Sequence, residues 1–261
     1  MMQQAQRRSR FGQSESNRSL VRGVEILRTF RPGIDLLGNG EISERTGLSK
    51  STTSRLTQTL VHTGLLDHDV KRRGYRLSAL TLALAHAMRV GSPAIALAAP
   101  RMKAASERLH LNVGLAVADR DAMVYLESVR YNPKASLRSI AAGQRVPIEL
   151  TSLGRAYIST LLDADRHALI NLVRSYRPSG WKWPTREIEA AVAGVRKHGY
   201  CAAAWQPGVV AVATPLQLSN WPTYVLNMST SAHAPTAIVA RKMRDDLLAL
   251  RQDLLEVMKG F

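Results

Sequence analysis

A run of short polar and basic side chains lies between residues 49 and 59 and contains no acidic residue. Its members include Lys50, Ser51, Thr52, Ser54, Arg55, Gln58 and Thr59. Hydroxyl, amide and guanidinium groups of this kind hydrogen-bond to the phosphate oxygens and base edges of DNA. Because the run has no carboxylate, nothing in it repels the DNA backbone. The residue types therefore indicate a nucleic-acid contact surface.

Two short helices joined by a tight turn are expected to position this surface. Gly47 stands where the first helix must end in a left-handed conformation, and Ser49 is a good cap for a second helix from Lys50. Leu56 and Leu60 are four residues apart, so one face of the second helix can be buried. The pattern is typical of a helix-turn-helix, whose second helix enters the major groove. An ordinary amphipathic hairpin with a solvated polar face has the same spacing and stays open as an alternative.

A basic turn follows the second helix. Residues 68–78, HDVKRRGYRLS, predict a short strand, a turn and a returning strand, with Lys71, Arg72, Arg73 and Arg76 around Gly74. Such a hairpin resembles a wing that lies along the phosphate backbone. A solvated loop tip is the alternative for the basic run taken alone. Its position directly after a helix of the recognition type favours the wing.

The strongest arrangement for catalysis is Cys201 as a nucleophile near His198. A nucleophilic cysteine needs a base oriented on the thiol and a site for the oxyanion, and the sequence gives evidence for neither. The seven histidines are scattered, with no pair at the spacing of helical metal ligands, and no glycine-rich phosphate loop is present. We therefore predict no catalytic residue, no metal site, no cofactor and no enzyme activity.

The chain of 261 residues carries a formal net charge of +16, which favours nucleic acid as a partner. Its single cysteine rules out an internal disulfide framework and fits a reducing cytoplasm. No stretch approaches the ~20 uninterrupted apolar residues of a membrane span, and the basic start lacks the apolar core of a signal peptide. The sequence thus predicts a cytoplasmic protein without a membrane partner. A non-specific nucleic-acid-binding protein with a structural C-terminal domain is the alternative function.

Changes in composition and hydrophobic pattern along the chain predict its domain organisation. Residues 1–17 are expected to form a flexible basic arm, 18–78 a winged helix-turn-helix, 79–109 a helical linker and 110–261 an α/β domain. In the first domain a helix is expected over residues 19–30, and Asn39 is expected to cap the first helix of the helix-turn-helix. The apolar segment 78–88 lacks a clear polar face, which indicates burial between subunits or domains.

Strand-like and helix-like segments mix after residue 111. Strands are expected at 112–119, 123–131, 134–141, 200–204, 209–216 and 223–229, and helices at 151–162, 163–174, 235–257 and in a segment capped by Thr185. This mixture predicts an α+β fold in which the C-terminal domain is sensor-like.

Several stretches together resemble the IclR family of bacterial transcriptional regulators, over about residues 19–259. They are RSLVRGVEILRTF, ISERTGLSKSTTSRLTQTLVHTGLL, YRLS, VYLESV, GQRVPIELTSLGRAYIS and HGYCAAAWQPGVVAVATPL. Each is weak alone, but their order and spacing together are specific. The resemblance implies an N-terminal winged helix, a helical linker and a C-terminal GAF-like domain that binds a small effector. It also implies a homodimer or dimer of dimers that binds palindromic operator DNA and represses or activates transcription.

Site residues follow from the polar run and from the resemblance. For DNA we predict Ser49, Lys50, Ser51, Thr52, Ser54, Arg55 and Gln58 in the groove, and Arg72 and Arg73 at phosphates. For the effector the resemblance implies Ser152, Leu153, Gly154, Ala211, Asn227 and Ser229.

One departure from the family bears on the effector. Members often carry an acidic run after the Gly-Tyr pair, whereas here Gly199 and Tyr200 are followed by Cys201, three alanines and Trp205. No effector contact from that run can be carried over to this chain. We therefore expect a small organic acid that is apolar or aromatic.

Overall fold

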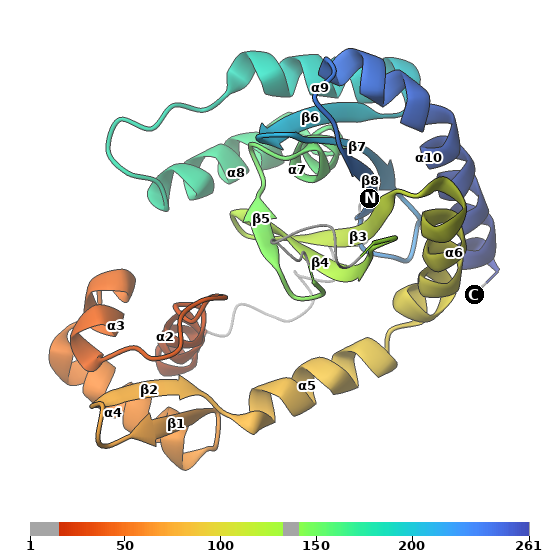
Figure 1. Ribbon diagram of the computed structural model, residues 1–261. Coiled ribbons are helices and arrows are strands. Elements are labelled where there is room, and N and C mark those ends of the chain that lie inside the picture. Colours follow the sequence, from red (N-terminus) through yellow and green to blue (C-terminus); the bar gives the residue numbers. More distant parts are fainter. Residues whose placement is uncertain (1–15, 133–140, 261) are drawn as a thin grey trace. The chain divides into compact units, whose positions relative to one another are not determined.

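The computed structural model describes residues 16–132 and 141–260 (Figure 1). The chain forms two compact units, one ending at Gly91 and the other beginning at Ser92. Nearly all of the predicted basic arm and of the strand predicted at 134–141 lies outside the described residues. The predicted linker, residues 79–109, contains one helix from each unit.

The N-terminal unit is a small helical domain with one β-hairpin. Its elements are α2 (Arg18–Leu27), α3 (Asn39–Thr46), α4 (Lys50–His62), β1 (Leu66–Asp69), β2 (Gly74–Leu77) and α5 (Ala79–Val90). Its core consists of Ile26, Leu37, Ile42, Leu56, Leu60, Leu66 and Tyr75. These residues come from α2, α3, α4, the hairpin and the loop before α3. A single apolar cluster therefore fixes α4 against α3.

Helix α2 is shorter than the predicted helix over 19–30. It ends at Leu27, and the Thr29 hydroxyl donates to the carbonyl of Ile26 at 2.6 Å. This local hydrogen bond satisfies a carbonyl at the helix end and competes with another helical turn. The side chain of Asn17 accepts from the amides of Ser19 and Leu20 and caps the start.

The C-terminal unit is built on one antiparallel sheet with strand order β5-β4-β3-β8-β7-β6 (Figure 1). The strands are β3 (Asn112–Asp119), β4 (Ala122–Val129), β5 (Arg145–Pro147), β6 (Cys201–Gln206), β7 (Val209–Leu216) and β8 (Tyr224–Ser231). The helices are α6 (Pro93–Leu109), α7 (Ser152–Ile158), α8 (Asp163–Ser175), α9 (Thr185–His198) and α10 (Thr236–Lys259).

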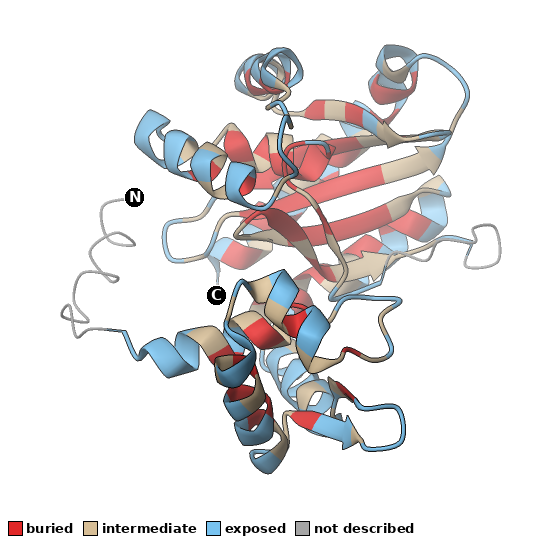
Figure 2. Ribbon diagram, turned by 90° about the vertical axis from the view of Figure 1, so that its left-hand side faces the viewer, coloured by how far each residue is buried: buried red, intermediate tan, exposed pale blue. Residues whose placement is uncertain are grey.

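Helices cover both faces of this sheet, and side chains alternate between the two layers along each strand. On β8, Leu226 and Met228 pack with α6 and α10, whereas Val225 packs on the other face with α7, α8 and α9. Figure 2 shows the buried residues running along the strands of the sheet and under the helices. The predicted mixed α+β fold is confirmed.

Two predicted details of the helices are corrected by the structure, and one predicted strand is confirmed. Helix α7 ends at Ile158 rather than residue 162, because the hydroxyls of Ser159 and Thr160 donate back to backbone carbonyls and end the helix. Thr185 does not cap α9: it is the first helical residue after Pro184, and its hydroxyl lies 3.4 Å from the Trp183 carbonyl. The strand predicted at 209–216 coincides with β7.

The apolar segment predicted to be buried is α5, which has no buried residue within the described chain. Leu80, Leu82, Leu84, Met88 and Val90 are all exposed there. Among the described residues no single helix is long and apolar enough to cross a membrane, and the consecutive helices α5 and α6 reach that length and composition only when taken together.

Candidate nucleic-acid interface and ligand site

The turn between α3 and α4 has the predicted geometry. Gly47 adopts a left-handed conformation with φ of 69° at the end of α3. Ser49 caps α4, since its side-chain oxygen accepts from the amide of Thr52 at 3.3 Å. The Ser49 oxygen also lies 2.9 Å from the Thr52 hydroxyl. The hydroxyl group that is predicted to contact DNA is therefore also the group that caps the helix.

Helix α4 separates an apolar stripe from a polar face. Thr53, Leu56, Thr57 and Leu60 are buried against the N-terminal core. Of the nine residues predicted to contact DNA, Thr52 and Ser54 are half-buried and seven are exposed: Ser49, Lys50, Ser51, Arg55, Gln58, Arg72 and Arg73. None of the nine lies in the core, so their side chains share the solvent-facing side of α4 and the hairpin tip.

The sequence predicts Asn39 as the cap of α3, but in the structure Asn39 is the first residue of that helix. The residue before it, Gly38, occupies the cap position, and its amide donates to the Glu41 carboxylate at 2.9 Å. The Asn39 side chain instead accepts from the Thr57 hydroxyl at 3.1 Å and contacts the Tyr75 hydroxyl at 3.4 Å. It therefore ties α3 to α4 and to the hairpin.

The hairpin β1–β2 is held against the loop before α3. Leu37 and Tyr75 exchange backbone hydrogen bonds of 3.0 and 2.8 Å, which form an isolated β-bridge to the hairpin. A Cβ on Gly74 would lie 2.5 Å from the Leu36 side chain, so only glycine allows this close approach. Arg73, beside it at the tip, has a positive φ of 52°.

The wing arginines are not all equivalent. Arg72 forms an exposed ion pair with Asp35 at 2.6 Å, and the Arg72 guanidinium lowers the pKa of that carboxyl through this hydrogen bond. Arg76 pairs with Asp69 on the facing strand. Arg73 has no ion-pair partner within the described residues. A phosphate could therefore reach Arg73 directly, whereas at Arg72 it would compete with Asp35.

In the C-terminal unit the predicted effector residues lie on α7 and on the sheet face beneath it. Thr151 caps α7 by accepting from the Gly154 amide at 3.1 Å. Ser152 and Leu153 are buried, each 1% exposed. A Cβ on Gly154 would lie 1.8 Å from the carbonyl oxygen of Ile148. The absence of a side chain at Gly154 is thus required for packing, whatever its role toward a ligand.

Ala211, Asn227 and Ser229 come together on neighbouring strands. Ala211 of β7 pairs with Ser229 of β8, and Ala213 pairs with Asn227 two residues further along. Because side chains two residues apart share a face, all four point to the side of the sheet that α7 covers. The row continues to Cys201, which pairs with Ala213 and whose thiol contacts the Ser152 carbonyl at 3.4 Å. Cys201 thus connects this face to α7.

Tyr125 is a buried residue of β4 that was not predicted from the sequence to belong to the site. Tyr125 packs on the same face, and its hydroxyl accepts from the Asn227 side-chain amide at 3.4 Å. Its signal in the sequence was the VYLESV stretch, which indicated only a strand. The contact spans 102 positions of the chain, and strand pairing at that separation cannot be read from local spacing.

The environment of Cys201 keeps its thiol protonated. The side chain is buried, and burial raises the thiol's pKa to about 12, with a smaller opposing effect from Arg155. His198, the proposed base of the catalytic alternative, is an exposed residue at the end of α9. A nucleophilic cysteine needs a lowered pKa, so the Cys201 environment is unsuited to that chemistry.

This raised pKa predicts a specific loss of stability at alkaline pH. An unfolded cysteine loses its proton near pH 9 and the folded one near pH 12, so the folded state binds more protons between those values. The free energy of unfolding must therefore fall as pH rises through this window. Between pH 8 and 10.5 we expect wild type to lose about 2 kcal/mol more than Cys201→Ala in urea unfolding. Equal losses in the two proteins would contradict this environment.

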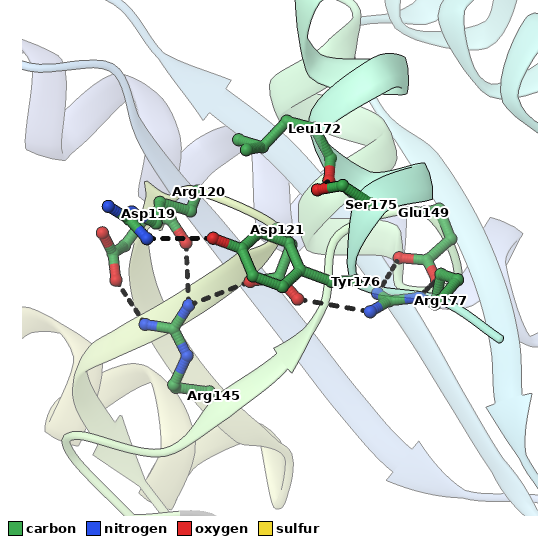
Figure 3. A network of polar contacts seen from close by, with 9 residues as sticks. All are labelled: Asp119, Arg120, Asp121, Arg145, Glu149, Leu172, Ser175, Tyr176 and Arg177. Atoms are coloured by element: carbon green, nitrogen blue, oxygen red, sulfur yellow. Dashed lines mark hydrogen bonds and ion pairs between the residues drawn. The ribbon is translucent and has the colours of Figure 1, made fainter. Parts of the chain in front are cut away.

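A network of charged side chains around the buried Glu149 holds the segment that leads into α7 (Figure 3). Arg177, just beyond α8, donates from Nε and Nη2 to the two carboxylate oxygens of Glu149 at 2.8 and 2.9 Å. Its Nη1 donates to Asp121 at 3.2 Å, and Asp121 also contacts Arg145 of β5. Glu149 is only 1% exposed, so its charge depends on Arg177 for compensation.

The network joins parts of the unit that are distant in sequence. Arg145 also pairs with Asp119 at the end of β3, and Arg120 in the β3–β4 turn donates to the Tyr176 hydroxyl at 2.9 Å. Arg155 of α7 donates from Nε to the Glu149 carbonyl at 3.2 Å. The start of α7 is thereby fixed to the end of α8, to β5 and to the β3–β4 turn.

Two family models cover most of the chain. The IclR helix-turn-helix domain matches residues 19–70, and the bacterial transcriptional regulator IclR C-terminal domain matches residues 88–250. The chain belongs to the IclR family of bacterial transcriptional regulators. It therefore has a DNA-binding helix-turn-helix domain and an effector domain, and its family is one of regulators, which are generally not enzymes.

Individual IclR relatives match this chain over nearly its whole length. The HTH-type transcriptional regulator TsaQ1/TsaQ2 of Comamonas testosteroni is 33% identical over 93% of this chain and 88% of its own length. The crystal structure of an IclR family regulator from Brucella abortus has a TM-score of 0.81 at 29% identity, covering 94% of this chain and 96% of that one. An IclR homologue from Microbacterium hydrocarbonoxydans, complexed with 4-hydroxybenzoate, has a TM-score of 0.64 at 22% identity, covering 90% and 98%.

Proposed function

We propose that this regulator binds palindromic operator DNA through the winged helix and responds to a small organic acid in its C-terminal unit. The observation that carries the DNA part is the division of α4. Its buried stripe packs on the N-terminal core, and the side chains able to contact bases and phosphates remain solvent-accessible on the opposite face. Operator DNA is cytoplasmic in bacteria, so the proposal places the protein there.

Arg55 and Arg73 are expected to differ in how they contribute to DNA binding. Arg55→Ala should cost about 1–3 kcal/mol on the operator and reduce the preference over random DNA, because it removes a predicted base contact. Arg73→Ala should weaken binding to all sequences and lower the salt slope by about one, because it removes a phosphate contact. Fluorescence anisotropy on operator and random duplexes over a salt series measures both.

The matched control for these variants is Lys197→Ala. Lys197 is exposed in the last turn of α9, in the other unit, and its loss changes the net charge equally. We expect operator affinity to change little in this variant. Unchanged operator affinity in Arg55→Ala would show that α4 is not the recognition helix.

The effector part of the proposal is supported by the match to the IclR C-terminal domain and by the face that α7 covers. Buried Asn227 and half-buried Ser229 and Ala211 lie together there, and no acidic side chain follows Tyr200 on β6. The Microbacterium homologue shares the fold and was solved with 4-hydroxybenzoate, so aromatic hydroxy acids are the first compounds to test.

A homodimer or dimer of dimers is supported by apolar side chains that the described chain leaves uncovered. On α2 they are Leu20, Val21 and Val24, and on α5 they are Leu80, Leu82, Leu84, Met88 and Val90. Helices with such faces gain stability by packing against a partner. Two copies related by a two-fold axis would also match the symmetry of a palindromic operator. Effector occupancy would then act by favouring one placement of the two winged helices over another.

A further inference from the structure

Tyr125 of β4 and Asn227 of β8 form a buried polar pair on the sheet face that α7 covers. They are 6% and 4% exposed, and the Asn227 amide nitrogen contacts the Tyr125 hydroxyl at 3.4 Å. Both belong to a layer that is otherwise apolar, with Ala116, Met123 and Val225 beside them. A polar pair in such surroundings needs all of its hydrogen-bonding groups to be satisfied.

Glycine on the intervening strand brings the two side chains together. Gly114 of β3 pairs with Asn227, and a Cβ at Gly114 would lie 2.5 Å from Asn227 Oδ1 and 2.4 Å from Tyr125 Cε1. A β-bulge at Leu115 and Ala116 displaces the register of β4 next to it. Any larger residue at Gly114 would push the two side chains apart, so contact between Tyr125 and Asn227 requires glycine at this position.

The pair leaves hydrogen-bonding capacity unused. Asn227 Oδ1 is buried and has no hydrogen-bond partner among the described residues, and the same holds for Oδ1 of Asn112, which pairs with Ser229. An unmet buried acceptor destabilises the protein, and a ligand that donates a hydrogen bond to it would remove that cost. The Tyr125 O–H remains available as a donor, since burial raises its pKa to about 12.

The residues next to the pair on this face of the sheet are small. Ala213 pairs with Asn227, and Ala211 and Ala203 follow in the next row of the sheet. Exposure increases along β8 from buried Asn227 to half-buried Ser229 and exposed Ser231. A molecule lying over Ala211 and Ser229 would therefore meet Asn227 at its inner end.

We propose that the Tyr125–Asn227 pair recognises a hydroxyl group of the effector, so that the effector is a hydroxylated organic acid. The ligand hydroxyl donates to Asn227 Oδ1 and accepts from the Tyr125 O–H. A carboxylate only accepts, so it leaves Oδ1 unpaired and occupies another position. This inference rests on the proposed acid-sensing function.

Matched pairs of acids test the role of the hydroxyl group. Isothermal titration of the full-length protein would compare 4-hydroxybenzoate with benzoate, 3-hydroxybenzoate with benzoate and 4-hydroxybutyrate with butyrate. In the pair that fits the site, the hydroxylated acid should bind roughly tenfold to a hundredfold more tightly, because the deoxy acid leaves buried groups unpaired. Equal binding of the two members would overturn the inference.

Variants of Tyr125 and Asn227 test whether these two residues cause the difference in affinity between hydroxylated and deoxy acids. In Tyr125→Phe and in Asn227→Ala the ratio of the two dissociation constants should fall toward one, a readout that a general loss of stability would not produce. Tyr224→Phe removes a tyrosine hydroxyl from the opposite face of the same sheet and should preserve the ratio. A ratio that survives in both pair variants would contradict the inference while leaving acid sensing intact. If no acid bound and none altered operator binding, the acid-sensing function would fail together with the inference.

Discussion

Gly154→Ala is expected to lower the free energy of unfolding by about 3 kcal/mol or more. The added Cβ would lie 1.8 Å from the carbonyl oxygen of Ile148 and 2.4 Å from its carbonyl carbon. Both are backbone atoms, so no change of side-chain rotamer can relieve the overlap. Since the buried Glu149 follows directly and is held by Arg177, the backbone cannot move without disturbing that ion pair. Thermal unfolding followed by circular dichroism measures the effect.

Gly40→Ala is the control for adding the same methyl group to a helix. Gly40 lies in α3, and a Cβ there would meet no atom within 4 Å. Its stability should change by less than about 1 kcal/mol, in the direction of the higher helix propensity of alanine. A Gly154→Ala protein that melted as the wild type does would show that α7 packs less closely on Ile148 than described.

Arg177→Met is expected to cost about 3–5 kcal/mol, because it leaves the buried Glu149 carboxylate without its cation. Glu149 receives two hydrogen bonds from the guanidinium, and Asp121 receives a third. Asp121 keeps its contact with Arg145, so the main loss falls on Glu149. Urea unfolding at neutral pH provides the free energy of unfolding.

The double variant Arg177→Met with Glu149→Leu should recover most of that loss, because it removes the unpaired charge as well. Arg244→Met is the control, since its pair with Asp245 is exposed and should contribute at most about 1 kcal/mol. A single Arg177→Met variant as stable as the control, or a double variant no better than the single, would contradict a network that depends on charge compensation.

Much of the N-terminal unit could be predicted because its signals are local. Gly47 and Ser49 stand within a few residues of the helix ends that they define, and Leu56 and Leu60 mark the buried stripe of α4 by spacing alone. The start of α3 was missed because two candidates for the cap are adjacent. Glu41 binds the amide of Gly38, which decides the position in favour of Gly38 rather than Asn39.

The C-terminal unit shows where local patterns fail. The strand over 209–216 follows from its β-branched and alternating composition, but its partners do not. Asn227 meets Tyr125 across 102 positions, and Arg177 meets Glu149 across 28, so only the register of the sheet and the packing of α8 bring them together. Asp35 likewise pairs with Arg72 across 37 positions, which changes the expected availability of a wing arginine.

We propose that this IclR-family chain couples specific DNA binding to the binding of an organic acid. The most direct measurement is a gel-shift of the purified full-length protein on DNA upstream of its own gene, with excess random competitor. It would be repeated with aliphatic and aromatic carboxylic acids, including the hydroxylated and deoxy pairs. We expect a complex that survives the competitor and whose amount changes with one acid of the series. A complex that random DNA abolishes would contradict the account and favour a basic protein that binds DNA through charge alone.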